Sequence, residues 1–297
     1  MSFFDIIRFI WNHPLASRNR GLAFKRFFFW QIGQKLSNNR PVLYPLVEDS
    51  ALLVQKGMAG ATGNIYTGLA EFEDMVFILH ALREGDQFAD IGANIGVYTI
   101  LASKNAGAKV ISVEPIPGTF EKLRRNVELN QVADRVELLC YGVGDRHGSL
   151  RFTKDYDAVN HVVSENESFD SHALIEVPVR PLDELLAGRQ PVFCKIDVEG
   201  FELPALKGAA GILASPLLKG VIIELNGSAG RYGYSDDMIH QLLLSYNFAP
   251  YLYEPFSRVL TAVSKYGDFN TIYLRDVEWV RSRLKASRKY TVLGREI

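Results

Sequence analysis

The sequence predicts an α/β fold in which helices cover both faces of a mostly parallel sheet. From about residue 70 onward, short apolar segments of strand length alternate with longer segments whose apolar residues recur at helical spacing. Hydrophobic residues make up 47% of the 297 residues, which is enough to bury a full core. Apolar strands separated by helices are typical of a parallel sheet that is buried on both sides.

The helices are predicted from the spacing of their apolar residues. Glu71–Leu82 places Phe72, Val76 and Leu79 on one side, and Gly85-Asp86 follows as a stop signal. A later segment tolerates Pro204 because proline fits the first turn of a helix. In chain order, the predicted helices cover residues 71–82, 97–106, 118–130, 203–213 and 236–246.

The strands are predicted from short apolar runs bounded by turn residues. Two of them flank a polar segment in the middle of the chain, and the last two are expected to close the sheet. In order, they cover residues 87–91, 109–113, 135–141, 149–153, 176–180, 192–197, 220–225, 250–254 and 271–274.

Residues 1–57 are predicted to form a helical extension ahead of the α/β domain, which is placed at 58–297. Seven basic residues and one acidic residue give residues 1–40 a formal net charge of +6, against −1 for the whole chain. Nine Phe and Trp residues lie in the same stretch. This composition suits a peripheral contact with an anionic membrane. We favour an arm packed on the core or on a second subunit of a homo-oligomer, because the apolar residues do not form one clean stripe.

The near-neutral charge makes nucleic acid a poor candidate partner. No cleavable signal peptide is visible, because Asp5 and Arg8 interrupt the apolar start and no cleavage site follows. The expected location is therefore the cytoplasm, with the inner membrane face as the alternative.

A glycine loop, Asp90-Ile91-Gly92-Ala93-Asn94-Ile95-Gly96, joins one predicted strand to the next helix. Gly92 and Gly96 would let backbone approach a ligand where a Cβ would collide. The loop departs from the dinucleotide fingerprint, because Asn94 and Val97 occupy its second and third glycine positions. This departure counts against an NAD-dependent oxidoreductase.

Acidic and basic residues follow two further strands. Glu114 ends the strand at 109–113, where a carboxylate can accept hydrogen bonds from ribose hydroxyls. Lys195 and Asp197 share one face of the strand at 192–197, and Glu199 follows at its mouth. Because the carboxyl ends of parallel strands meet at one edge, these side chains are expected to form a single site.

The order of these motifs resembles the FkbM family of class I methyltransferases over about residues 60–275. The resembling segments are Tyr66–Glu73, Phe88–Thr99, Val113–Pro117, Leu123–Asn130, Pro181–Leu185 and Lys195–Glu202. The resemblance implies a Rossmann-like fold with a seven-stranded sheet, with S-adenosyl-L-methionine as cofactor. It also implies methyl transfer to oxygen, on a small-molecule or saccharide acceptor such as a glycan precursor or secondary metabolite.

The resemblance also assigns roles by position. Asp90, Gly92, Asn94 and Gly96 would lie along the methionine half of the cofactor, and Glu114 would hold the ribose. Near the adenine it places Gly144 and Asp145. Asp197 would lie beside the sulfonium and the acceptor, and Glu73 would face the cofactor.

An alcohol acceptor must lose its proton as the new bond forms. Asp197 or Glu199 is expected to accept it, with Lys195 setting the local charge, and His161 is a rival base. Asp197, Glu199 and Glu224 offer oxygen atoms to a divalent metal, but we expect no metal because Lys195 balances part of that charge. A non-catalytic cofactor-binding or membrane-tethering module is the other class of function considered.

Overall fold

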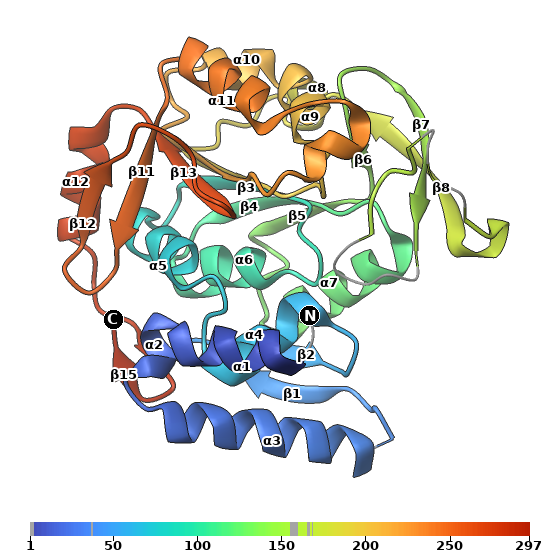
Figure 1. Ribbon diagram of the computed structural model, residues 1–297. Helices are drawn as coiled ribbons and strands as arrows, with labels where there is room; N and C mark the ends of the chain where they lie inside the picture. Colours follow the sequence, from blue (N-terminus) through green and yellow to red (C-terminus); the bar gives the residue numbers. More distant parts are fainter. Residues whose placement is uncertain (1–2, 37, 155–159, 165–166, 168) are drawn as a thin grey trace.

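The computed structural model describes residues 3–36, 38–154, 160–164, 167 and 169–297. A central sheet lies between two layers of helices, and the N-terminal helices form a further layer beneath one of them (Figure 1). The predicted α/β class is therefore confirmed.

The central sheet has eight strands in the order β12-β11-β13-β10-β9-β3-β4-β5. Its parallel part consists of β3 (Gln87–Ile91), β4 (Lys109–Val113), β5 (Val136–Leu139), β9 (Phe193–Ile196) and β10 (Gly220–Glu224). Its antiparallel edge consists of β11 (Ala249–Glu254), β12 (Val259–Ala262) and β13 (Asn270–Leu274). Chain order reverses between β3 and β9, which is where such sheets bind ligands.

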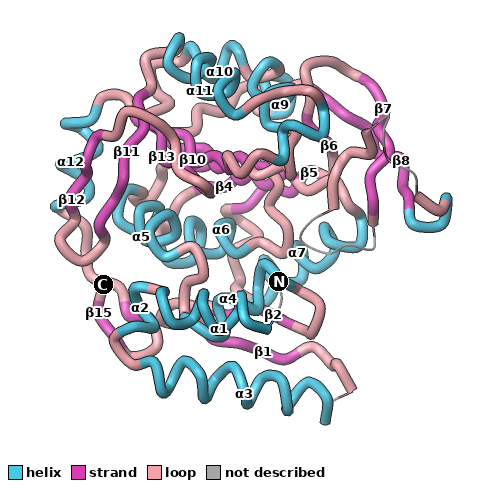
Figure 2. The backbone as a smooth tube through the Cα atoms, in the orientation of Figure 1, coloured by secondary structure: helices cyan, strands magenta, loops and turns pink. Residues whose placement is uncertain are grey.

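Helices cover both faces of the sheet (Figure 2). Each face buries its own hydrophobic cluster. One face is covered by α5 (Phe72–Ala81), α6 (Val97–Ile100) with a π-helical continuation (Leu101–Asn105), α7 (Pro117–Leu129) and α12 (Val277–Lys285). The other is covered by α8 (Leu182–Leu185), α9 (Glu202–Lys207), α10 (Ala210–Ala214) and α11 (Asp236–Ser245).

A small second sheet stands beside the open edge at β5. It has the order β6-β8-β7, made from β6 (Gly142–Val143), β7 (Gly148–Thr153) and β8 (Leu174–Arg180). Phe152, Val177 and Val179 from these strands bury a third cluster together with Ile116 and Val162. Two 3-10 turns, Ser171–Ala173 and Ser228–Tyr232, complete this side.

The N-terminal extension packs on the core of the same chain. It contains α1 (Phe3–Asn12), α2 (Pro14–Ser17), α3 (Arg20–Leu36) and the hairpin of β1 (Val42–Pro45) with β2 (Ala51–Val54). The next helix, α4 (Ala59–Thr67), and the C-terminal pair β14 (Thr291–Val292) and β15 (Arg295–Glu296) lie against it. Buried residues of the extension share one cluster with those of α5. Among the described helices, none is both long and apolar enough to cross a membrane.

Four of the observed elements differ from those expected from the sequence. The hairpin β1–β2 was not predicted, because β1 is largely exposed and lacks an alternating pattern. Strand β12 adds an eighth strand to the expected seven. Helix α4 was also not predicted. The single helix expected at 203–213 is split into α9 and α10, because the backbone leaves helical geometry at Gly208 (ψ 3°) and Ala209 (φ −119°, ψ 21°).

Two asparagines of α7 join the extension to the domain. The Asn126 side chain accepts a hydrogen bond from Leu53 N (2.8 Å) and donates one to Ile95 O (2.8 Å). Asn130 in turn accepts from Ala51 N (2.9 Å) and donates to Ala51 O (2.7 Å). Because Asn126 is fully buried, it ties β2 to the glycine loop away from water.

We predict that Asn126→Ala lowers the free energy of unfolding by about 2 kcal/mol, because it leaves the Leu53 amide and the Ile95 carbonyl without partners. Urea unfolding measures this loss. The control is Gln241→Ala on the exposed side of α11, which should change stability by less than about 0.5 kcal/mol. Equal stability of Asn126→Ala and the parent protein would contradict the role given to this residue.

Candidate functional site

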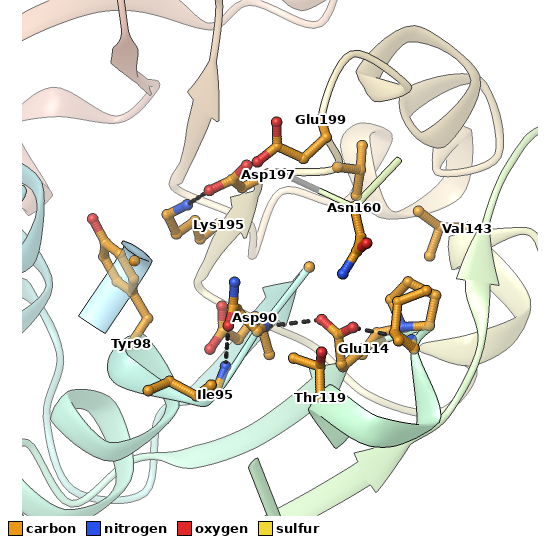
Figure 3. A pocket seen from close by; sticks show the side chains of 18 of the residues that line it. Asp90, Ile95, Tyr98, Glu114, Thr119, Val143, Asn160, Lys195, Asp197 and Glu199 are labelled. Carbon is orange, nitrogen blue, oxygen red and sulfur yellow. Dashed lines mark hydrogen bonds and ion pairs between the residues drawn. The ribbon is translucent and has the colours of Figure 1, made fainter. Parts of the chain in front are cut away.

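A cavity of about 220 Å³ opens at the carboxyl ends of β3, β4, β9 and β10. Figure 3 shows Lys195, Asp197 and Glu199 at one end and Glu114 and Val143 at the other, with Asp90 between them. The parallel register explains why these residues meet. Asp90 pairs with Lys195 across β3 and β9, and Ile222 of β10 lies opposite Lys195 on the other side.

The glycine loop is shaped by its two glycines, which both have positive φ. Gly92 has φ +77°, and a Cβ there would lie 1.8 Å from the Asp197 carbonyl oxygen. Gly96 has φ +92°, and a Cβ there would lie 2.5 Å from a methyl carbon of Leu123. Gly92 and Asn94 line the cavity, whereas Gly96 is needed for the packing of α7 and lies outside the lining.

Glu114 is buried at the end of β4 and closes the loop from below. Its carboxylate accepts hydrogen bonds from the amides of Asn94 and Ile116, both at 3.0 Å. Burial raises the pKa of Glu114 to about 7, and these two amides oppose that shift. Glu114 lines the cavity, and each of its carboxylate oxygens can accept a further hydrogen bond. It therefore suits a ligand that donates hydrogen bonds from hydroxyl groups.

Asp90 lies on the cavity floor, and its contacts run into the core. Thr99 donates a hydrogen bond to the Asp90 carboxylate (2.6 Å), and the Thr99 hydroxyl also contacts Ser112 (2.8 Å). Burial raises the pKa of Asp90 to about 6. The second carboxylate oxygen is therefore held in one orientation beside the loop.

Lys195 and Asp197 form an ion pair with a 2.6 Å contact between Lys195 Nζ and Asp197 Oδ2. Lys195 is 3% exposed, and its ammonium also lies 4.9 Å from the ring centre of Tyr98. Although burial opposes it, the negative charge of Asp197 holds the pKa of Lys195 above its usual value. Lys195 therefore stays charged and keeps Asp197 oriented at the cavity wall.

Glu199 and Glu224 complete an acidic cluster with Asp197. Their carboxylate oxygens and one of Asp197 all lie within 4.8 Å of one another. Burial and the charge of Asp197 raise the pKa of Glu199 to about 9 and that of Glu224 to about 8. Oε2 of Glu224 is buried and has no hydrogen-bond partner among the described residues.

Glu71 was missed by the sequence analysis, which chose Glu73. Glu73 is exposed and does not line the cavity, whereas Glu71 at the start of α5 does. The Glu71 carboxylate accepts hydrogen bonds from the Tyr98 hydroxyl (2.7 Å) and Asn270 Nδ2 (2.6 Å). Both Glu71 and Tyr98 lie in segments that carried the family resemblance, so their positions, though not their roles, were marked in the sequence.

The far end of the cavity is lined by Tyr141, Gly142 and Val143. Gly144 and Asp145, expected near the adenine, are displaced from it. Gly144 is buried against Val179 and Gly208, and Asp145 points to solvent. The short strand β6 carries the chain out of the cavity before residue 144 is reached.

His161 lies beside the cavity without lining it. Its ring Nε2 contacts Glu167 Oε1 at 3.2 Å, while the neighbouring Asn160 and Val162 face the cavity. The Tyr232 hydroxyl donates to Val162 O (2.6 Å), which fixes this segment over the site. Residues 155–159 of the same loop lie outside the described part of the chain.

The relatives found among known proteins include three methyltransferases. Hexuronic acid methyltransferase AglP of Haloferax volcanii is 32% identical over 154 residues, covering 50% of this chain and 59% of AglP. Methyltransferase 1 of Beauveria bassiana is 25% identical over 190 residues, which cover 57% of this chain and 76% of that protein. The 31-O-demethyl-FK506 methyltransferase FkbM of Streptomyces tacrolimicus is 38% identical over 90 residues, which cover 29% of this chain and 34% of that protein.

The sequence-family model described as the methyltransferase FkbM domain matches residues 90–250. This segment begins at the cavity floor and ends in β11. This segment contains the glycine loop, Glu114 and the Lys195–Asp197 pair, and it amounts to more than half of the chain. The chain therefore belongs to the FkbM methyltransferase family.

Proposed function

We propose that this protein is an S-adenosyl-L-methionine-dependent methyltransferase that methylates a hydroxyl group of a saccharide. The observation that carries the cofactor assignment is the acidic lining of the cavity. Among the described residues that line it, six are acidic and one is a lysine: Glu71, Asp90, Glu114, Asp197, Glu199 and Glu224, with Lys195. Such a cavity favours a cation and disfavours the two phosphates of a dinucleotide.

The residues fit the cofactor at both ends. The absent Cβ of Gly92 lets the glycine loop meet the end of β9 at one wall of the cavity, and Glu114 presents acceptors suited to ribose hydroxyls. The unpartnered oxygen of Glu224 and the Asp197 carboxylate lie at the opposite end, where a positive sulfur would be stabilised. When bound, the sulfonium supplies an activated methyl group.

Asp197 is the best placed proton acceptor in the cavity. Glu199, the other acceptor predicted from the sequence, has a pKa of about 9 and therefore carries a proton near neutral pH. The Asp197 carboxylate is 25% exposed to the cavity and is fixed by Lys195. Lys195 thus acts as a positioning residue that orients the base.

The nature of the acceptor is proposed from the relatives. AglP is named for hexuronic acid and FkbM for an O-demethyl substrate, so a hydroxyl-bearing saccharide or secondary metabolite is the favoured class. The experiment is to incubate the protein with isotope-labelled S-adenosyl-L-methionine and hexuronic acid glycosides, and to search for methylated products by mass spectrometry. The proposal fails if no labelled product forms with saccharides or with a cell extract.

The proton acceptor can be tested by substitution. We expect Asp197→Asn to lower kcat by about a hundredfold or more, because a general base contributes 10²–10⁴-fold. His161→Ala is the matched control and should retain kcat within about fivefold, since its ring contacts Glu167 outside the cavity. The measurement is the kcat of each variant from steady-state kinetics, after thermal unfolding has shown that both variants are folded. Full turnover by Asp197→Asn would remove Asp197 from the mechanism.

The raised pKa of Glu199 predicts a pH-dependent stability. Below its ordinary pKa of 4.5, Glu199 is protonated in both the folded and the unfolded chain. Between 4.5 and about 9 the unfolded chain releases this proton more readily, so the free energy of unfolding falls as pH rises. Glu199→Gln has no such proton, so its free energy of unfolding relative to the parent protein should rise between pH 5 and pH 9, by on the order of 5 kcal/mol at about 1.4 kcal/mol per pH unit.

Urea unfolding at pH 5 and pH 9 measures this difference, with Glu176→Gln on the exposed side of β8 as control. The control should show the same offset from the parent protein at both pH values. If Glu199→Gln also shows a constant offset, Glu199 is not held protonated by its surroundings.

Metal independence remains a prediction for the Asp197–Glu199–Glu224 cluster. The Lys195 ammonium already neutralises Asp197, and two of the three carboxyls carry raised pKa values, which weakens them as ligands at neutral pH. We expect turnover to be unchanged after dialysis against EDTA. A loss of activity that Mg²⁺ or Mn²⁺ restores would show that the cluster binds a metal.

A further inference from the structure

Helix α3 has two apolar faces, of which one is buried and one is exposed. Ala23, Phe27 and Trp30 are buried against the rest of the chain. On the opposite side the exposed large apolar residues are Leu22 (43% exposed), Phe28 (50%), Phe29 (66%), Ile32 (57%) and Leu36 (82%). Leu22, Phe29 and Leu36 are seven residues apart and so lie along one line. The sequence showed no clean stripe because apolar residues occupy both the buried and the exposed side of the helix.

Helix α1 packs against α3 and carries exposed apolar side chains of its own. It lies beside α3 at one end of the molecule, and rings of the two helices meet at Phe3–Phe27 (centroids 6.0 Å apart) and Trp11–Phe24 (6.5 Å) (Figure 1). Its exposed rings are Phe3, Phe4 and Trp11. We call the exposed apolar side chains of α1 and α3 the N-terminal platform: Phe3, Phe4, Trp11, Leu22, Phe28, Phe29, Ile32 and Leu36.

Basic side chains are interspersed with the platform. The Lys25 ammonium lies 5.6 Å from the ring centre of Phe29, and the Arg20 guanidinium lies 4.5 Å from that of Trp11. Arg8 and Lys35 are exposed on the same two helices. Asp5 is the one acidic residue among residues 1–40 in the sequence. The surface is therefore apolar and cationic together.

We propose that the N-terminal platform docks on the surface of an anionic lipid bilayer. Aromatic and aliphatic side chains on helices lying in the bilayer plane enter the boundary between headgroups and acyl chains, while Lys and Arg contact anionic headgroups. A second copy of the chain fits less well, because a symmetric contact would bring two cationic surfaces together. This inference is independent of the cofactor and acceptor proposed above.

The test is vesicle flotation with the full chain, comparing phosphatidylcholine vesicles with vesicles that also contain phosphatidylglycerol. Binding should be at least about tenfold stronger to the anionic vesicles and should weaken with salt. Phe29→Ser with Ile32→Ser, and separately Lys25→Glu with Lys35→Glu, should each lower binding about tenfold. Both pairs change exposed side chains, so thermal unfolding should be unaffected.

The matched controls are Leu217→Ser with Leu252→Ser, which are exposed apolar residues elsewhere, and Lys285→Glu on α12. Controls that bind like the parent protein support the proposal. It is overturned if the parent protein does not float with anionic vesicles, if it binds neutral vesicles equally well, or if both platform variants bind normally. A dimer in light scattering that the platform variants abolish, without vesicle binding, would assign the surface to self-association instead.

Discussion

The close approach between the loop after β3 and the end of β9 determines the architecture of the site. Because Gly92 has no Cβ, the Asp197 carbonyl can lie where a side chain would otherwise be. The Asp197 amide also donates to Ile91 O (3.0 Å), so the two strands continue in register past their last paired residues. This contact brings the glycine loop and the Lys195–Asp197 pair to the same wall of one cavity.

Electrostatics then gives the cavity its character. Carboxyls surround the buried Lys195 ammonium, and burial together with neighbouring negative charges raises the pKa values of Asp90, Glu114, Glu199 and Glu224. A positively charged ligand in the cavity would lower these pKa values, because it favours the ionised form of each carboxylate. Buried acidic clusters of this kind lower folding stability, and carboxyls with such raised pKa values are found more often at functional sites than elsewhere.

The sequence contained most of the fold and part of the site. Strand and helix alternation was visible because β3, β4, β9 and β10 are mainly apolar and buried, whereas β1 and β12 are short edge strands with exposed residues. Asp90, Glu114, Lys195 and Asp197 were found because parallel strands present their carboxyl ends together. Two positions in the cavity lining were not predicted: Glu71 lines it rather than Glu73, and Tyr141–Val143 line it rather than Gly144. Which of these residues faces the cavity depends on where α5 begins and where β6 turns away, and local sequence does not specify either point.

The account depends centrally on the cavity binding a sulfonium cofactor. Isothermal titration calorimetry with S-adenosyl-L-methionine, S-adenosylhomocysteine and NADH tests this most directly. The account predicts saturable binding of the first two at one site per chain, and no heat of binding for NADH. Binding of NADH with no response to either adenosyl compound would contradict it.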